Sequence, residues 1–262
     1  MPETIHLSHE HLEAFEQQGV LHLHGFYPWA DIQEMAHRLW ADLEARYGMV
    51  RDRPESWTVA APAQFQTLKR AGAFSALGSP KLFALADTLL GVGAWEMPAR
   101  WGGPLVTFPT RSPILRRPPW HLDVSGAEQL VPLPVLRVFT FLEPLAPGGG
   151  GTLYVAGSHH LAIEVERAHG APVQSAQVRD RLKAEHPWFA GLLATPTANL
   201  RRLVNVDVRI GSQTLRLEEM TGDPGDLIVM HPALLHGTSH NALDRPRMML
   251  TEWIRRREVP AP

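Results

Sequence analysis

Residues 222–254 read GDPGDLIVMHPALLHGTSHNALDRPRMMLTEWI, and this stretch decides the fold because two strand patterns flank a histidine-rich segment. A turn containing Gly and Pro comes first, and the segment 226–230 that follows it, apolar from Leu227 onward, is typical of a buried strand. The run 247–254 begins a second strand, on which an extended backbone puts four side chains on one face: Arg247, Met249, Thr251 and Trp253. The stretch therefore predicts two strands of a β-rich core.

Short runs of the same kind fill the chain from Trp95 onward. They are rich in β-branched and aromatic residues and are bounded by turn-forming residues, at 95–100, 104–108, 135–144, 151–156, 202–210 and 213–220. The 23 prolines and 21 glycines suit many turns better than a helical bundle. We therefore predict a mainly β core with flanking helices, built as a double-sheet jelly roll or a small barrel.

The first 92 residues are expected to be mostly helical. Three segments place apolar residues at helical spacing between a capping residue and a glycine: 8–19, 29–48 and 79–91. Their expected N-caps are Ser8, Asp31 and Ser79. Between the first two helices, 20–26 alternates like a short strand, and we interpret its His22 and His24, which share one face, as structural residues.

A further helical segment, 160–200, lies between strand patterns and is interpreted as an insertion into the β core. Insertions of this kind commonly cover a functional site. The whole chain, 1–262, is expected to form one domain, with a helical part at 1–92 and the core at 93–254.

Composition narrows the possible functions. The 262 residues carry 25 Lys and Arg against 27 Asp and Glu without a long run of one sign, so neither a nucleic-acid nor an anionic-membrane partner is expected. Because the sequence shows neither a signal-peptide pattern nor 18 consecutive apolar residues, we expect a cytoplasmic protein that acts on a small molecule, and its oligomeric state stays open. The chain has no cysteine, which leaves His, Asp and Glu as metal ligands.

The stretch 118–126, PPWHLDVSG, contains a His-x-Asp pair, His121 and Asp123. A similar pair, His11 and Glu13, lies in the first expected helix, where residues two apart project about 200° from each other and cannot readily share a metal. The prolines before His121 disfavour a helix, and in an extended segment its imidazole and the Asp123 carboxylate point to the same face. Such a pair suits two of the three ligands of a two-histidine, one-carboxylate iron site.

The second histidine is expected from the segment after the apolar strand, where His231, His236 and His240 are candidates. His236 is favoured because it precedes Gly237, where the backbone can turn sharply, but the residues alone leave all three open. Arg247 shares its strand face with apolar residues and needs an anionic partner if it is buried, and its planar fork suits a carboxylate. A solvated strand end is the alternative for this arginine.

These segments together resemble the phytanoyl-CoA dioxygenase family of Fe(II)- and 2-oxoglutarate-dependent oxygenases. The similarity extends over residues 7–254 and is carried by LSHEHLEAFEQQGVLHLHGFY, WHLDV, GGGGTLYVAGSHH and the block that begins GDLIVMHPALLHGTSHN. The resemblance implies a double-stranded β-helix, or jelly roll, with His121, Asp123 and His236 as the iron ligands. It also implies that Arg247 binds the distal carboxylate of the co-substrate 2-oxoglutarate and that Thr238 lies near that carboxylate.

The resemblance further implies an O₂-dependent oxidation, such as hydroxylation of a small molecule, with release of succinate and CO₂. Related halogenases lack the carboxylate ligand, so the presence of Asp123 favours hydroxylation or a related oxidation. Two residues depart from the family pattern. Ala156 stands where a proline is usual, and Leu122 stands between the ligands where a polar residue is frequent, which suggests a less polar edge of the site.

Four residues are candidates for the substrate pocket: Trp101, Phe108, Phe141 and Arg117. Core packing is the alternative for each aromatic residue, and a solvated rim is the alternative for the arginine. Two other functions stay open. A cupin-type metalloenzyme that does not use 2-oxoglutarate would keep the metal ligands without needing Arg247, and a non-catalytic binding protein on the same fold would need neither.

Overall fold

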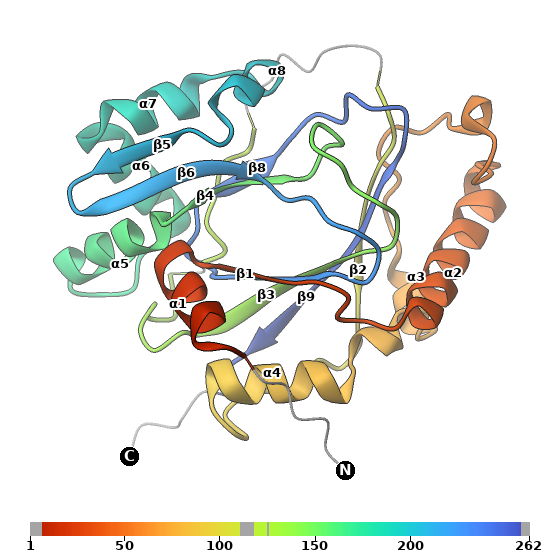
Figure 1. Cartoon of the computed structure of the whole chain (residues 1–262), viewed down its shortest axis with the longest axis horizontal. Helices are drawn as coiled ribbons and strands as arrows, with labels where there is room; N and C mark the ends of the chain where they lie inside the picture. The colour runs from red at the N-terminus through yellow and green to blue at the C-terminus, as the bar shows by residue number, and fades with distance from the viewer. Residues whose placement is uncertain (1–6, 111–117, 125, 258–262) are drawn as a thin grey trace.

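The computed structural model describes residues 7–110, 118–124 and 126–257, and its strands form two antiparallel sheets (Figure 1). The larger sheet has the order β1-β7-β3-β9-β2 and the smaller one the order β5-β6-β4-β8. The larger sheet consists of β1 (Val20–Leu23), β2 (Gly103–Thr107), β3 (Val135–Phe141), β7 (Leu227–Met230) and β9 (Arg247–Arg255). The smaller sheet consists of β4 (Thr152–Ala156), β5 (Asp207–Ile210), β6 (Gln213–Glu219) and β8 (His236–Thr238). These sheets and their flanking helices confirm the predicted fold class.

Two strands differ from the sequence-based expectation. The segment 95–100 contributes only an isolated bridge between Trp95 and Arg256 and is not a strand. A short strand that the sequence did not suggest, β8, begins at His236 and pairs with β4. Three residues are too few to show a period of two, so only the pairing partner reveals this strand.

The two sheets share a core between them. Met249 from β9 and Tyr154 from β4 belong to one buried cluster, although they come from different sheets. The alternate residue Leu250 belongs instead to the cluster beneath the N-terminal helices. The alternation predicted for 247–254 is therefore confirmed, and it turns the Arg247 face of β9 toward the space between the sheets.

The N-terminal helices are α1 (His9–Gln18), α2 (Trp29–Tyr47), α3 (Gln66–Arg70) and α4 (Pro80–Leu90), with short 3₁₀ turns at Pro54–Ser56 and Ser75–Leu77. Ser8 and Ser79 cap their helices as predicted. Asp31 does not, because α2 begins directly after Pro28 and Asp31 lies in its first turn, where its charge still favours the helix dipole. None of the described helices is both long and apolar enough to cross a bilayer.

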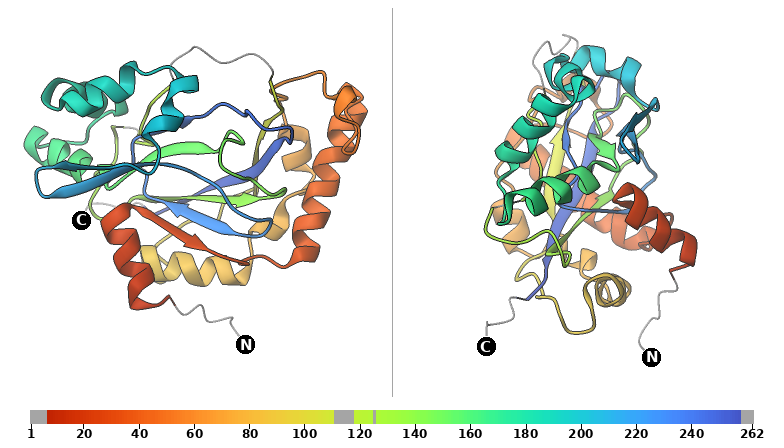
Figure 2. Two further views of the ribbon diagram at one scale, coloured as in Figure 1. Left: turned by 45° about the horizontal axis from the view of Figure 1, so that its top comes forward. Right: turned by 90° about the vertical axis from the view of Figure 1, so that its left-hand side faces the viewer.

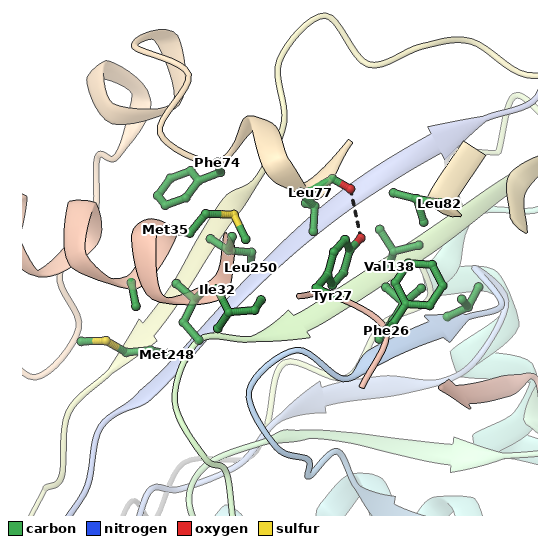
Figure 3. Close-up of a cluster of buried hydrophobic side chains, with 14 of the residues drawn as sticks. Phe26, Tyr27, Ile32, Met35, Phe74, Leu77, Leu82, Val138, Met248 and Leu250 are labelled. Carbon is green, nitrogen blue, oxygen red and sulfur yellow. Dashed lines mark hydrogen bonds between the residues drawn. The ribbon is translucent and has the colours of Figure 1, made fainter. Parts of the chain in front are cut away.

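The helices α2 and α4 pack on the outer face of the larger sheet. Ile32 and Met35 of α2 and Leu82 of α4 lie against Val138 and Leu250 of the sheet. Figure 3 shows this core and the hydrogen bond that closes it, in which the buried Tyr27 hydroxyl donates to the Leu77 carbonyl at 3.0 Å. The N-terminal helices therefore cover one face of the larger sheet, and its other face points toward the smaller sheet.

The predicted helical insertion forms α5 (Ser158–His169), α6 (Ser175–Glu185), α7 (Pro187–Ala194) and α8 (Thr197–Leu200), followed by a 3₁₀ turn at Arg201–Leu203. Its apolar side chains pack on the outer face of the smaller sheet, in one cluster with Val155 and Leu217. Figures 1 and 2 show these helices on the side of the molecule away from α2. Each sheet therefore has its own helical cover.

Candidate metal centre

Three side chains from two distant parts of the chain converge at one edge of the smaller sheet: His121, Asp123 and His236. The backbones of His121 and His236 form an antiparallel bridge, each N–H donating to the other residue's carbonyl at 2.9 Å. The imidazole Nε2 atoms lie 3.7 Å (His121) and 3.6 Å (His236) from the two oxygens of Asp123. These distances are too long for hydrogen bonds and leave a point between the three groups that a metal ion could occupy.

Both imidazoles are oriented by the backbone. His121 Nδ1 lies 2.7 Å from the Pro119 carbonyl and His236 Nδ1 lies 2.9 Å from the Leu234 carbonyl. Because a carbonyl oxygen only accepts hydrogen bonds, each Nδ1 is the donor, which leaves Nε2 as the ring nitrogen that faces Asp123 and can bind a metal. This is the arrangement in which histidines bind metals, with the second ring nitrogen fixed by a backbone acceptor.

The charges and burial of these three side chains favour binding of a cation. Burial lowers the pKa of His236 to about 4, against the opposing effect of Asp123, so its imidazole is neutral at pH 7. Asp123 Oδ2 is buried and has no hydrogen-bond partner among the described residues. A buried carboxylate oxygen without a partner is costly, and a bound cation would satisfy it. The donor set of two imidazoles and one carboxylate fits non-haem Fe(II).

Gly237 has a different role from the one that the sequence suggested. It lies within β8 and not in a sharp turn. A Cβ atom there would lie 3.1 Å from Pro118 Cβ and 3.3 Å from the Trp120 ring, so the missing side chain lets the segment that carries His121 approach β8 closely. The His-Gly pair therefore brings two ligands together by close packing.

The position of Leu122 corrects a second expectation. Its side chain points away from His121 and Asp123 and is buried among the insertion helices and the outer face of the smaller sheet. Alternation along the extended segment explains this, because the residue between two ligands must face the opposite side. Leu122 therefore does not form the edge of the site, and its apolar character serves packing.

Arg247 is buried, with 6% of its surface exposed, so the solvated strand end is wrong. Its guanidinium donates to the Gly150 carbonyl at 2.8 Å, and its Nε has no partner among the described residues. Burial lowers the pKa of Arg247 to about 10, with Glu219 opposing the shift, so the group remains charged at pH 7. A buried cation held by one carbonyl is suited to receive an anion.

Thr238 lies in β8 two residues after His236, so the two side chains share one face of the strand. Its partner in the register is Thr152, which follows closely after Gly150, the acceptor of Arg247. Thr238 is exposed. The structure therefore places it on the strand that carries His236, near the segment that Arg247 reaches.

Sequence reasoning missed Arg137, which lies on β3 beside the proposed ligands. Its Nε is 3.6 Å from Asp123 Oδ2, and its guanidinium stacks over the Trp253 ring at 4.0 Å. Nε is buried without a hydrogen-bond partner among the described residues. Burial lowers the pKa of Arg137 below its ordinary value, and Asp123 opposes that shift. The sequence offered one sign of this role, an arginine within the otherwise mostly apolar run 135–141. Its position beside Asp123 follows only from the tertiary structure.

The other candidate histidines lie elsewhere. His231 is buried against His159 and Phe15, where α1 and α5 meet β7, and His240 lies near Thr110. Of the two groups of side chains in the described residues that could hold a metal, only the one at His121 contains a residue from the histidine-rich segment.

A family model of the phytanoyl-CoA dioxygenases matches residues 15–249. The chain belongs to the phytanoyl-CoA dioxygenase family. The match covers the proposed ligands and every strand except most of β9, and it confirms the resemblance seen in the sequence motifs. A comparison with curated proteins finds no match.

Several solved structures share the fold. AviO1 from Streptomyces viridochromogenes Tue57 is 17% identical, with 99% of each chain covered and a TM-score of 0.59. The non-haem 2-oxoglutarate-dependent carbocyclase SnoK of nogalamycin biosynthesis is 18% identical, with 95% of this chain and 84% of that chain covered and a TM-score of 0.54. The epimerase SnoN, in complex with Fe³⁺, 2-oxoglutarate and nogalamycin RO, is 15% identical, with coverages of 94% and 82% and a TM-score of 0.52. At such identities the likeness shows the fold.

Two of the four residues expected in the substrate pocket lie elsewhere in the structure. Trp101 packs against Phe83 of α4, and Phe108 packs between Trp40 and Trp57, so both belong to the core behind the larger sheet. Each lies just outside the bounds of β2, where strand alternation no longer determines the side. Phe141 does face the space between the sheets, in a buried cluster, and its contact with substrate stays a prediction. Arg117 lies outside the described residues.

Proposed function

We propose that this protein is a non-haem Fe(II)- and 2-oxoglutarate-dependent dioxygenase, formed by the chain as one domain, that hydroxylates or otherwise oxidises a small molecule. The observation that carries this proposal is the convergence of two imidazole nitrogens and a carboxylate at His121, Asp123 and His236, where Asp123 Oδ2 has no hydrogen-bond partner in the described part of the chain. Family membership supports it, as does the fold shared with SnoN, a structure that holds iron and 2-oxoglutarate.

The three proposed ligands would hold Fe(II) on one face and leave its other positions free. When bound there, iron and 2-oxoglutarate supply an O₂-dependent oxidation that releases succinate and CO₂. The protein's own part is to hold the ligands in place. The carbonyls of Pro119 and Leu234 keep both Nε2 lone pairs directed at the metal position.

Arg247 would bind the distal carboxylate of 2-oxoglutarate, with Thr238 nearby. Its guanidinium is buried and charged, and among the described residues a single carbonyl accepts from it, so a bidentate carboxylate would complete its hydrogen bonding. A metalloenzyme that does not use a keto acid would have no such need for this arginine. Arg247 therefore favours the 2-oxoglutarate-dependent function over the cupin-type alternative.

Arg137 would present a second cation beside the metal. Once a metal ion shares the charge of Asp123, the guanidinium 3.6 Å from that carboxylate loses part of its compensation. An anionic group next to the metal, on the co-substrate or on the substrate, would then be favoured by Arg137. Hydroxylation is the simplest reaction that agrees with the intact carboxylate ligand Asp123.

The test is an anaerobic titration of the purified protein with Fe(II) and then with 2-oxoglutarate, followed by visible absorption. We expect a weak charge-transfer band that appears only when both are present, because it reports a keto acid chelated to iron. The variant H236A should show no band, and R245A, which removes an exposed arginine near Arg247, should keep it. If the wild-type protein shows no band, the 2-oxoglutarate-dependent function is wrong. If the band appears, a screen for substrate-stimulated succinate release identifies the substrate.

A further inference from the structure

A second group of potential ligands lies at the edge of the larger sheet. The edge strand β1 pairs antiparallel with β7, with His22 opposite Ile228 and Leu23 opposite Leu227. Continuing this register places His24 opposite Asp226. Because side chains two apart on a strand share a face, and opposite residues of an antiparallel pair do so too, His22, His24 and Asp226 all project to the same side.

The three side chains meet at one carboxylate oxygen. His22 Nε2 lies 2.9 Å and His24 Nδ1 lies 3.0 Å from Asp226 Oδ2, and the two imidazole rings are 4.1 Å apart. The Asp226 side chain is only 4% exposed, whereas that of His24 is 78% exposed. The group therefore has a buried carboxylate at its base and an exposed imidazole at its solvent side.

The carboxylate is held in place by the backbone. The Gly25 amide donates to Asp226 Oδ1 at 2.8 Å, and the Asp223 amide donates to Oδ2 at 3.2 Å. Burial raises the pKa of Asp226, but these amides and the two imidazoles outweigh it, so the pKa lies below its ordinary value. The carboxylate therefore keeps a fixed position at the base of the group.

We propose that His22, His24 and Asp226 form a second metal site, one that takes a divalent transition-metal ion of the zinc class. Two imidazole nitrogens and a carboxylate oxygen, all within 4.8 Å of one another, are a donor set that zinc accepts, and solvent can supply the remaining position. Without metal, the imidazoles hydrogen-bond to Asp226. A small rotation of the exposed His24 ring would open space for metal–ligand bonds of about 2.0–2.2 Å.

This site is separate from the one at His121. The Asp226 carbonyl accepts a hydrogen bond from Thr140 on β3, whereas Asp123 faces Arg137 three residues earlier on that strand, roughly 10 Å away along its axis. A metal bound at the second site would also have a structural effect on the N-terminal segment. Since β1 is an edge strand whose only paired strand in the described sheets is β7, a metal there would tie the N-terminal segment to the sheet.

The test is isothermal titration of untagged, metal-free protein with zinc. We expect two zinc equivalents for the wild type and one for H24A, whose exposed side chain can be removed without disturbing the fold. The matched control H37A removes an exposed histidine of α2 that belongs to neither group, and should still bind two. The double variant H121A/H236A should bind one equivalent, and adding H24A should abolish binding.

The two proposals fail in different ways. If H24A and the conservative variant D226N bind zinc with the stoichiometry and affinity of the wild type, the second site is wrong, whatever H121A/H236A does. If H121A/H236A still binds two equivalents, the metal centre of the proposed dioxygenase is wrong and the second site is unaffected. Thermal melting gives an independent reading, because zinc should raise the Tm of H121A/H236A and should not raise it after H24A is added.

Discussion

Adjacent residues in the sequence have different roles at the proposed iron site. His121 and Asp123 face the metal position, while Leu122 between them is buried in the core under the insertion helices. The cause is the two-residue period of an extended chain. The polarity of Leu122 therefore says nothing about which substrate can enter, and the neighbour that matters for charge is Arg137 from another strand.

This division of roles can be tested by two adjacent alanine substitutions. L122A should lower the free energy of unfolding by about 2–5 kcal/mol, because it leaves a cavity in a packed core, and should keep metal binding in the folded protein. H121A should abolish tight Fe(II) binding with little loss of stability, because this side chain is partly exposed. Urea unfolding and metal titration of both variants measure the two effects. Loss of metal binding in well-folded L122A would contradict the assignment.

A second test at the residue scale concerns Arg247. R247A should weaken 2-oxoglutarate binding by about 2–5 kcal/mol, at least 30-fold, because the distal carboxylate would be left in a buried site without its cation. Fe(II) affinity should stay within a few-fold of the wild type, since Arg247 is not a proposed ligand. R245A is the control, because it removes an exposed arginine two residues away. If R247A abolished iron binding instead, the role given to Arg247 would be wrong.

At the scale of elements, a cluster of histidines joins α1, α5 and the end of β7. His159 Nε2 donates to the Glu16 carbonyl at 2.9 Å, and the His159 ring stacks near His231 and His160. A Cβ atom at position 19, where φ is +75°, would lie 2.7 Å from His159 Nδ1, so Gly19 both ends α1 and makes room for the ring. The buried rings of His159 and His231 pack between these elements.

This cluster predicts a loss of stability in acid. Burial lowers the pKa of His159 to about 4 and that of His231 well below 6.5. The unfolded chain therefore binds more protons than the folded one between pH 6.5 and 4, and stability is full above about pH 6.5 and falls as the pH decreases through this window. For His159 alone the loss is about 3 kcal/mol. Chemical unfolding at several pH values measures it, and H159Q should show a smaller loss than the wild type. Equal slopes for both proteins would contradict this interpretation.

At the scale of the whole molecule, the proposed site exists only where the two sheets meet. His236 and the bridge to His121 belong to the smaller sheet, whereas Arg137 and Arg247 come from β3 and β9 of the larger one. The hydrogen bond from Arg247 to the Gly150 carbonyl crosses from one sheet toward the other. A keto acid that joined the metal to Arg247 would therefore cross-link the two sheets.

Ligand binding should accordingly stabilise the whole fold. With Fe(II) present, 2-oxoglutarate at 100 times its Kd should add about 2.7 kcal/mol, which corresponds to a rise in Tm of several degrees for a chain of this size. R247A should keep the rise caused by Fe(II) and lose the further rise caused by 2-oxoglutarate. Anaerobic thermal melting measures both increments. A 2-oxoglutarate increment that R247A leaves intact would show that the co-substrate binds elsewhere.

The sequence by itself determined what depends on neighbours along the chain. Ser8 and Ser79 cap helices, and His121 shares a face with Asp123, because capping and strand alternation act within a few residues. The inward face of β9, with Arg247 on it, followed from the same period. Family motifs then singled out His236 among three histidines that local pattern could not separate.

Only the tertiary structure decided which faces meet. Periodicity gives the side of a strand on which a residue lies, but not what packs against that side, which depends on pairing between distant segments. This is why Trp101 and Phe108, expected in the pocket, lie behind the larger sheet, and why Arg137 was missed. For the same reason the sequence did not predict the contact between His24 and Asp226, which lie 202 residues apart in the chain. The register of β1 on β7 brings them together.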